Sequence, residues 1–292
     1  MSCPSYSDVM ESKRLADVEL LHDLNKLVEW KPSLEKRSFA GNGFLYHFQL
    51  DNLCHVKVKG LSFHDIMNNE FERERAWTLC NKYGAKSRPN NAPLRLFEMW
   101  RRLNGAVVFF RPTVAKAIYS LVGATHVLDP TAGWGGRMLG AWAMGIDYTG
   151  FDTNEMLIDA YEGMYRMLDD KCNLTMRFED SLQADFSKID YDCVLTSPPY
   201  INLEMYPGMT LFESKERFYK GFLIPLIDKC LTHIRRNGWV CFNISPKIYR
   251  ELIGAGYGQC QREYDMKQQK IQGVDKGDKV YCWRARWLAP AS

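Results

Sequence analysis

The stretch from residue 126 to residue 144 restricts the fold more than any other part of the chain. A short strand pattern, His126–Leu128, ends in Asp129; a glycine-rich turn follows, and a helical pattern continues to about Met144. Glycine lets the backbone turn tightly and approach a ligand closely at the N-terminus of a helix. A second strand pattern, Tyr148–Asp152, comes next. This order predicts an α/β fold with a mostly parallel, doubly wound sheet.

Polar side chains recur where four consecutive predicted strands end: they are Asp129, Asp152, Asp180 with Ser181, and Ser197. In an open α/β sheet, ligands bind outside the carboxyl ends of the strands. An acid at the end of the second strand is placed to bind ribose hydroxyls. No Gly-Lys-Ser/Thr follows the glycines, which excludes a phosphate-binding loop of that kind. The loop Asp-Pro-Thr-Ala-Gly-Trp-Gly-Gly also departs from the Gly-x-Gly-x-x-Gly of dehydrogenases.

The turn Thr196-Ser197-Pro198-Pro199-Tyr200 follows the fourth of these strands. Two successive prolines remove two backbone donors and forbid a central strand, so carbonyl oxygens are left without ladder partners. These carbonyls and Ser197 can accept the N–H groups of a planar exocyclic amine, and Tyr200 can stack on its ring. The alternative is an ordinary strand-ending loop.

The two motifs together resemble those of the class I S-adenosylmethionine-dependent amino-methyltransferases that act on adenine N6 and cytosine N4 of DNA. These enzymes carry an Asp-Pro-Phe-x-Gly-x-Gly cofactor loop and an (Asp/Asn/Ser)-Pro-Pro-aromatic turn, and Phe110-Arg111-Pro112-Thr113 looks like their helix-opening motif. The resemblance covers roughly residues 105–290. It implies a Rossmann-like methyltransferase domain at 105–292. From their own patterns, residues 1–104 are predicted to form an α+β accessory region, a candidate for nucleic-acid recognition.

The resemblance also assigns roles to individual residues. S-adenosylmethionine would be bound by Phe110, Arg111, Pro112, Asp129, Thr131, Gly133 and Gly135 at its methionine end, by Asp152 at the ribose, and by Asp180 and Ser181 at the adenine. Ser197, Pro198, Pro199 and Tyr200 would hold the flipped base. Transfer would be direct and in line, so orientation of the amine is the main task of the site. No metal is expected.

Several departures from the family pattern leave alternatives open. Thr131 stands where phenylalanine is usual, and Trp134 and Arg137 are expected to crowd the loop. Ser197 favours cytosine N4 within the family. The segment 201–213 is too short for a large target-recognition insert, so recognition would fall to the N-terminal third, the end of the chain, a partner subunit or a second copy. An RNA amine methyltransferase and an inactive nucleic-acid-binding subunit remain the alternatives.

The N-terminal third shows three patterns. Residues 7–30 and 62–82 predict helices, the second capped by Ser62, while 39–60 predict a short hairpin or small sheet. Residues 73–102 interleave arginines and lysines with aromatic side chains, as a surface that tracks phosphates needs. Lys86 and Arg88, in a polar loop there, are predicted to bind nucleic acid; a solvated helix face over core aromatics is the alternative.

Composition bounds the remaining classes. The chain has 292 residues, a formal net charge of +3 and nine cysteines without metal-binding spacing. We therefore expect a reduced, cytoplasmic or nucleoid-associated protein that is neither secreted nor in a membrane, since no signal pattern or membrane-length apolar run occurs. Any basic surface must be local. The expected partner is nucleic acid, DNA or RNA.

Overall fold

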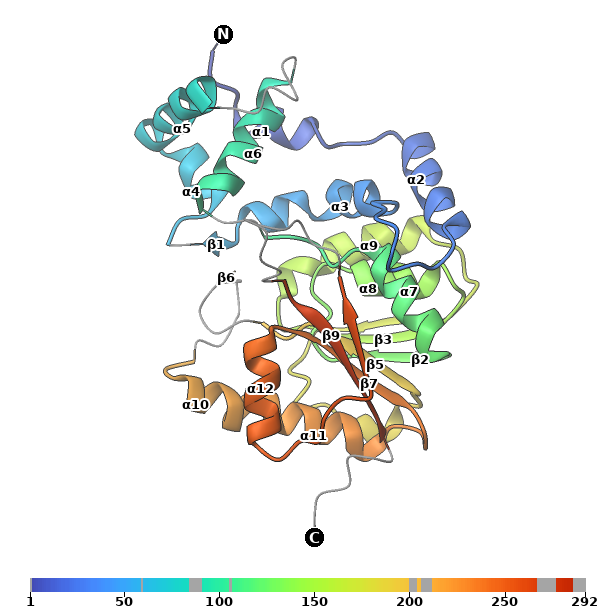
Figure 1. Ribbon diagram of the computed structural model, residues 1–292. Coiled ribbons are helices and arrows are strands. Elements are labelled where there is room, and N and C mark those ends of the chain that lie inside the picture. Colours follow the sequence, from blue (N-terminus) through green and yellow to red (C-terminus); the bar gives the residue numbers. More distant parts are fainter. Residues whose placement is uncertain are drawn as a thin grey trace.

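A seven-stranded mixed sheet forms the centre of the protein in the computed structural model (Figure 1). The structure describes residues 2–58, 60–83, 91–104, 107–199, 204–205, 212–266 and 277–285. The strands are β2 (His126–Asp129), β3 (Asp147–Phe151), β4 (Leu174–Arg177), β5 (Cys193–Thr196), β7 (Trp239–Ile244), β8 (Arg262–Asp265) and β9 (Lys279–Arg284).

The order of the strands confirms the predicted sheet. It runs β4-β3-β2-β5-β7-β9-β8, with all pairs parallel from β4 to β7 and with β9 antiparallel to both of its neighbours. Counted within the sheet alone, this is the order 3-2-1-4-5-7-6. The chain therefore has the Rossmann-like, doubly wound sheet of a class I methyltransferase.

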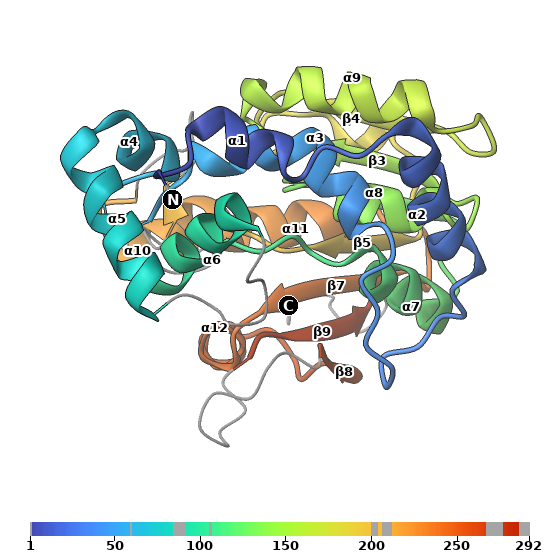
Figure 2. The ribbon, with the colours of Figure 1, turned by 90° about the horizontal axis from the view of Figure 1, so that it is seen from above.

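Helices cover both faces of the sheet (Figures 1 and 2). On one face lie α7 (Pro112–Val122), α8 (Gly136–Trp142) and α9 (Ile158–Met167); on the other lie α10 (Lys215–Phe218), α11 (Ile224–His233) and α12 (Pro246–Gly254). Because strand side chains alternate, each face has its own core. Val127 belongs to the first hydrophobic cluster and the adjacent Leu128 to the second.

The N-terminal region is helical where a hairpin was predicted. Its helices are α1 (Tyr6–Glu11), α2 (Asp17–Glu29), α3 (Asn42–Cys54), α4 (Phe63–Asn68), α5 (Glu70–Tyr83) and α6 (Ala92–Asn104). The hairpin prediction at 39–60 was wrong because Leu45, Gln49 and Leu53 recur at a helical spacing of four and are buried. Among the described residues of that stretch, Lys57–Val58 form the strand β1, which pairs antiparallel with β6 (Glu204–Met205). The predicted cap at Ser62 is confirmed, since its side chain accepts from the backbone N–H of Asp65.

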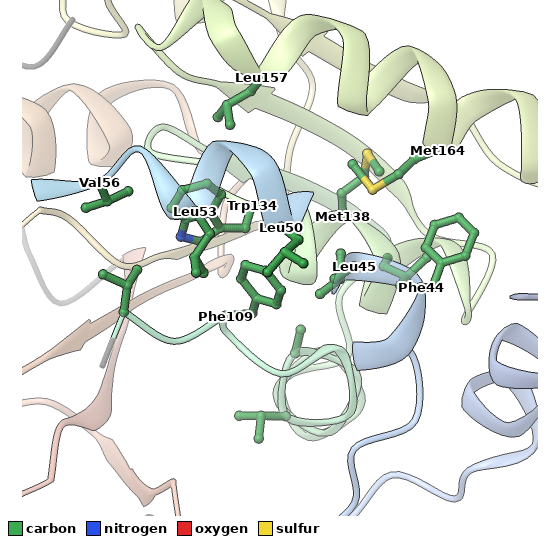
Figure 3. Packing of buried hydrophobic residues seen from close by; sticks show 14 of the residues in the cluster. Phe44, Leu45, Leu50, Leu53, Val56, Phe109, Trp134, Met138, Leu157 and Met164 are labelled. Atoms are coloured by element: carbon green, nitrogen blue, oxygen red, sulfur yellow. The ribbon is translucent and has the colours of Figure 1, made fainter. Parts of the chain in front are cut away.

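The N-terminal helices share their hydrophobic core with the sheet. Figure 3 shows Leu50 and Leu53 of α3 beside Phe109 and Trp134. In addition, the Lys116 ammonium of α7 donates to the carbonyl of Leu27 at the end of α2, at 2.9 Å. The division of the chain into two separate domains, 1–104 and 105–292, stays a prediction.

The start of α8 lies unusually close to the segment before α7. A Cβ atom on Gly136 would stand 1.9 Å from the carbonyl oxygen of Phe110, and one on Gly140 would stand 2.7 Å from the Cβ of Ala115. Both positions therefore need glycine, because a side chain would not fit. The close approach of Gly136 to the Phe110 carbonyl fixes the position of the glycine loop that precedes α8.

We expect Gly136→Ala to lower the free energy of unfolding by about 1–3 kcal/mol or more, because the backbone of Phe110 must move. Chemical denaturation monitored by circular dichroism measures this loss. Gly254→Ala in α12 is the matched control, since a Cβ there meets nothing within 4 Å. Equal stabilities of the two variants would contradict the close contact.

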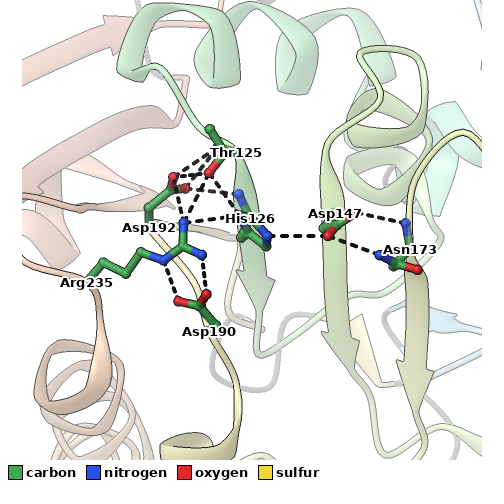
Figure 4. A network of polar contacts seen from close by, with 7 residues as sticks. All are labelled: Thr125, His126, Asp147, Asn173, Asp190, Asp192 and Arg235. Atoms are coloured by element: carbon green, nitrogen blue, oxygen red, sulfur yellow. Dashed lines mark hydrogen bonds and ion pairs between the residues drawn. The ribbon is translucent and has the colours of Figure 1, made fainter.

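A polar network joins the opposite, amino ends of the strands (Figure 4). The Asp192 carboxylate accepts from the backbone N–H groups of Thr125 and His126, at 3.0 and 3.1 Å. Arg235 pairs with both Asp190 and Asp192. The hydrogen bond from Arg235 holds the pKa of Asp190 below its ordinary value. The network ties β2, β5 and the turn before β7 together.

A lowered pKa makes this network sensitive to acid. The contribution of Asp190 is fully present above the ordinary pKa of 3.8 and is lost as the pH falls through the lower, folded-state value. We expect Asp190→Asn to flatten the fall in unfolding free energy between about pH 5 and pH 3, measured by urea titrations across that range. Asp170→Asn, at an exposed turn, is the charge-matched control. If the unfolding free energy of Asp190→Asn fell with pH as steeply as that of the wild type, the role of the Asp190–Arg235 pair would be refuted.

Candidate functional site

The ends of β2 and β5 meet at the carboxyl edge of the sheet. The two strands are parallel neighbours, and the hydroxyls of Thr131 and Thr196 lie 2.6 Å apart. The glycine loop and the Pro-Pro turn, separated by more than sixty residues in the sequence, therefore touch. The structure thus brings the two principal predicted motifs together.

Asp129 holds this junction from below. Its carboxylate is fully buried and accepts from Arg137 Nε at 2.6 Å, from the Tyr148 hydroxyl at 2.7 Å and from the Thr196 hydroxyl at 2.8 Å. All three partners belong to the protein. The carboxylate anchors the loop to two strands and a helix, and a contact of Asp129 with a cofactor stays a prediction.

Arg137 is the structural residue that the sequence analysis misread. Its side chain points beneath the loop, where Nη2 donates to the carbonyls of Thr131 and Ala132 and the guanidinium lies 5.1 Å from the Phe110 ring. Burial alone would lower the pKa of Arg137, but the carboxylate of Asp129 outweighs it and the pKa is raised. The expectation that Arg137 and Trp134 crowd the loop was wrong. Trp134 packs instead against Phe109, with ring centroids 5.8 Å apart.

The glycine loop is shaped by positive φ angles and by Asp152. Gly133 has a φ of 58° and Gly135 a φ of 84°, a region that favours glycine. A Cβ on Gly133 would meet no atom within 4 Å, so the surface above it is open. Asp152, at the end of β3, accepts from the backbone N–H groups of Gly133 at 2.7 Å and Asn154 at 2.9 Å. Burial raises the pKa of Asp152, and these two hydrogen bonds oppose the shift.

The Pro-Pro turn is fixed on its other side by β7. Ser197 is half-buried, and its hydroxyl lies 3.2 Å from the amide oxygen of Asn243. The amide nitrogen of Asn243 donates to the Lys279 carbonyl at 3.3 Å, which orients the amide. Pro198 is buried and Pro199 half-buried; Tyr200 lies outside the described residues. Asn243 was not predicted, and only its place in a buried strand could have drawn attention to it.

The segment Phe110-Arg111-Pro112 opens α7 as predicted, with Pro112 at the start of the helix. The Arg111 guanidinium donates to the carbonyl of Met266 at 2.5 Å and lies 5.9 Å from the Phe39 ring. Burial, and then the charge of Arg37, lower the pKa of Arg111. Arg111 therefore connects Phe39 of the N-terminal region with Met266, the residue that follows strand β8.

Asp180 and Ser181 follow β4 at the same edge. The exposed carboxylate of Asp180 accepts from the backbone N–H of Leu182 at 2.9 Å, forming a local turn. Ser181 is buried, and its carbonyl accepts from Lys229 at 2.9 Å. Asp180 thus has a structural role in the turn, while its predicted contact with an adenine stays a prediction.

In the described parts of the predicted basic and aromatic surface at 73–102, most of the aromatic side chains belong to the core, while the arginines and lysines are half-buried or exposed. Trp77, Phe97 and Trp100 are buried, which agrees with the alternative of a solvated helix face over core aromatics. Tyr83, at 60% exposure, is the exception. Lys86 and Arg88 lie outside the described residues. Figure 2 shows α4, α5 and α6 at the same end of the molecule as α12, which directly follows β7, so these helices lie on the side of the carboxyl strand ends.

A further hollow of the surface lies in the N-terminal region. A depression of about 570 Å³ is lined by Asp23, Lys26, Glu29, Trp30, Ser38, Phe39 and Ala40, none of which follows a strand of the sheet. Within the described ranges, no three His, Cys, Asp or Glu side chains gather as a metal site requires. Of the helices that the structure describes, none combines the length and apolar character needed to cross a membrane.

Comparisons with known proteins give no family for the chain. No family model and no curated protein matches the sequence. Matching solved structures include an rRNA methylase from Streptococcus thermophilus (13% identity, 61% of this chain and 97% of that chain, TM-score 0.39). An RNA methyltransferase from Salinibacter ruber, in complex with S-adenosyl-L-homocysteine, also matches (17% identity, 64% of this chain and 98% of that chain, TM-score 0.36). The magnesium protoporphyrin IX methyltransferase from Synechocystis with bound S-adenosylmethionine matches as well (14% identity, 72% of this chain and 96% of that chain, TM-score 0.40). These TM-scores are too low to support an argument about function.

We expect Arg137→Met to lower the free energy of unfolding by about 3–5 kcal/mol, because it leaves the Asp129 carboxylate buried without its cation. The double variant Asp129→Asn/Arg137→Met should recover part of this loss, since neither charge is then left alone. Urea denaturation of the two variants measures the difference. Arg166→Met, on an exposed pair with Glu162, is the control and should change stability far less. A double variant no more stable than Arg137→Met would contradict the pairing.

Proposed function

We propose that the protein transfers a methyl group from S-adenosylmethionine to an exocyclic amine of a nucleic-acid base, cytosine N4 or adenine N6 in DNA. The observation that carries the proposal is the 2.6 Å contact between Thr131 and Thr196. It joins a glycine loop suited to a nucleoside cofactor to a Pro-Pro turn suited to an amine. A class I methyltransferase sheet supports both ends of this contact.

The residues at the ends of β2 and β3 fit such a cofactor. The open surface above Gly133 admits a ligand against the backbone, and the Asp152 carboxylate beside it has lone pairs left for ribose hydroxyls. When bound, S-adenosylmethionine supplies an electrophilic methyl group. Phe110, Arg111 and Pro112, through the contact of the Phe110 carbonyl with Gly136, would shape the methionine end.

The Pro-Pro turn would orient the target amine. Ser197 and the carbonyl groups of the turn would accept its N–H hydrogens, so that the nitrogen lone pair faces the methyl group for direct, in-line transfer. The N–C bond would form as the S–C bond breaks, S-adenosylhomocysteine would leave, and the nitrogen would release one proton to these acceptors or to water. Asn243 contacts the turn through the Ser197 hydroxyl, and Pro198 of the turn is buried. A base in a duplex must be flipped out to reach this position, whereas a single strand presents it directly.

The choice of DNA rests on the order and form of the motifs, which resemble DNA amino-methyltransferases. The test is incubation with tritiated S-adenosylmethionine and, separately, duplex DNA, single-stranded DNA and total RNA, followed by nucleoside mass analysis. Label in N4-methylcytosine or N6-methyladenine of DNA is the expected result. Label confined to RNA would replace the substrate and keep the reaction. No label in any nucleic acid, despite cofactor binding, would contradict the proposal.

We expect Ser197→Ala to lower methyl transfer on the order of a hundredfold, because one acceptor for the amine is lost at the reacting centre. The dissociation constant for S-adenosylhomocysteine, measured by calorimetry, should stay at the wild-type value. Ser120→Ala, at an exposed position of α7, is the control. Loss of cofactor affinity in Ser197→Ala would instead assign the turn to the cofactor.

A further inference from the structure

The two threonine hydroxyls at the junction form a directed hydrogen-bond chain. Thr131 Oγ1 and Thr196 Oγ1 are 2.6 Å apart, and Thr196 Oγ1 is 2.8 Å from the Asp129 carboxylate. Thr196 is fully buried, while Thr131 is half-buried at the edge of the sheet. The distance between the two hydroxyls does not by itself say which one donates.

Asp129 decides the direction of this chain. The Asp129 carboxylate is paired with Arg137 at 2.6 Å, and a carboxylate in an ion pair only accepts hydrogen bonds. Thr196 must therefore donate its single proton to Asp129. It then offers Thr131 only a lone pair, so Thr131 must donate to Thr196.

The consequence is that Thr131 turns only lone pairs toward a ligand. Ser197 has the same polarity, because its proton points to the amide oxygen of Asn243, whose nitrogen is held by the Lys279 carbonyl. The hydroxyls of Thr131 and Ser197 thus face a ligand as hydrogen-bond acceptors. Such an edge accepts N–H donors and repels a carbonyl oxygen, which would face lone pairs without a proton between them.

We infer that Thr131 is a specificity-determining acceptor for an N–H donor, with Thr196 and Asp129 as positioning residues that set its polarity. The inference rests on the proposed function and names one residue of that site. The donor is the ammonium of the methionine part of the cofactor or the exocyclic amine of the target. Both present N–H groups, which the lone pairs of Thr131 favour over acceptors.

Two binding measurements separate these sources. Calorimetry compares S-adenosylhomocysteine with an analogue in which hydrogen replaces the ammonium group. Fluorescence anisotropy compares labelled oligo-dC with oligo-dU, and oligo-dA with oligo-dI, pairs that exchange an amine for a carbonyl at one ring position. We expect Thr131→Val to reduce one of these preferences by about tenfold or more, since a hydrogen bond to a charged or buried group is lost.

Matched variants make the outcome specific. Thr131→Ser keeps the hydroxyl and should keep the preference, while Thr196→Val frees the Thr131 proton and should act as Thr131→Val does. If the preference for S-adenosylhomocysteine over its analogue falls, the donor is the ammonium of the cofactor. If the preference for oligo-dC over oligo-dU, or for oligo-dA over oligo-dI, falls, the donor is the amine of the target. Unchanged preferences in both would overturn the inference alone. A wild-type protein that binds neither S-adenosylhomocysteine nor its analogue would overturn the proposed function and this inference with it.

Discussion

The buried ion pair between Asp129 and Arg137 is the interaction on which the candidate site depends. Removing two charges from water costs several kcal/mol, and the pair is tolerable only because the remaining lone pairs and protons are satisfied. The hydroxyls of Tyr148 and Thr196 donate hydrogen bonds to the Asp129 carboxylate, and the Arg137 guanidinium donates to carbonyl groups of the loop. The same bonds that satisfy the pair therefore fix the glycine loop, a neighbouring strand and the Pro-Pro turn in one arrangement.

The N-terminal helices contribute to this arrangement from outside the sheet. The side chains of α3 lie against the helices that follow the glycine loop, and Trp134 of the loop packs in the same cluster. Beyond them, the pairing of β1 with β6 connects the N-terminal region to the segment that follows the Pro-Pro turn. The region is thus placed both to support the cofactor side and to reach the target side of the proposed site.

Local patterns predicted the sheet because strand, turn and helix signals lie within a few residues of one another. They failed at α3, where the alternation of Leu45 to Phe48 resembles a strand and burial against other helices decides the conformation. They left two readings open for Trp77 and Trp100, whose burial depends on the packing of α5 and α6. The polarity of Thr131 could not be predicted, since it depends on contacts across the sheet between residues far apart in the chain.

The central claim is that the ends of β2 and β5 form one site for cofactor and amine. Photolabelling with tritiated S-adenosylmethionine, followed by trypsin digestion and mass analysis, tests it most directly. The label is predicted in the tryptic peptide 117–137, which carries the glycine loop, or in 189–215, which carries the Pro-Pro turn, and excess S-adenosylhomocysteine should suppress it. Suppressible label concentrated in a peptide that carries none of the predicted cofactor residues, such as residues 27–36 at the end of α2, would contradict the account.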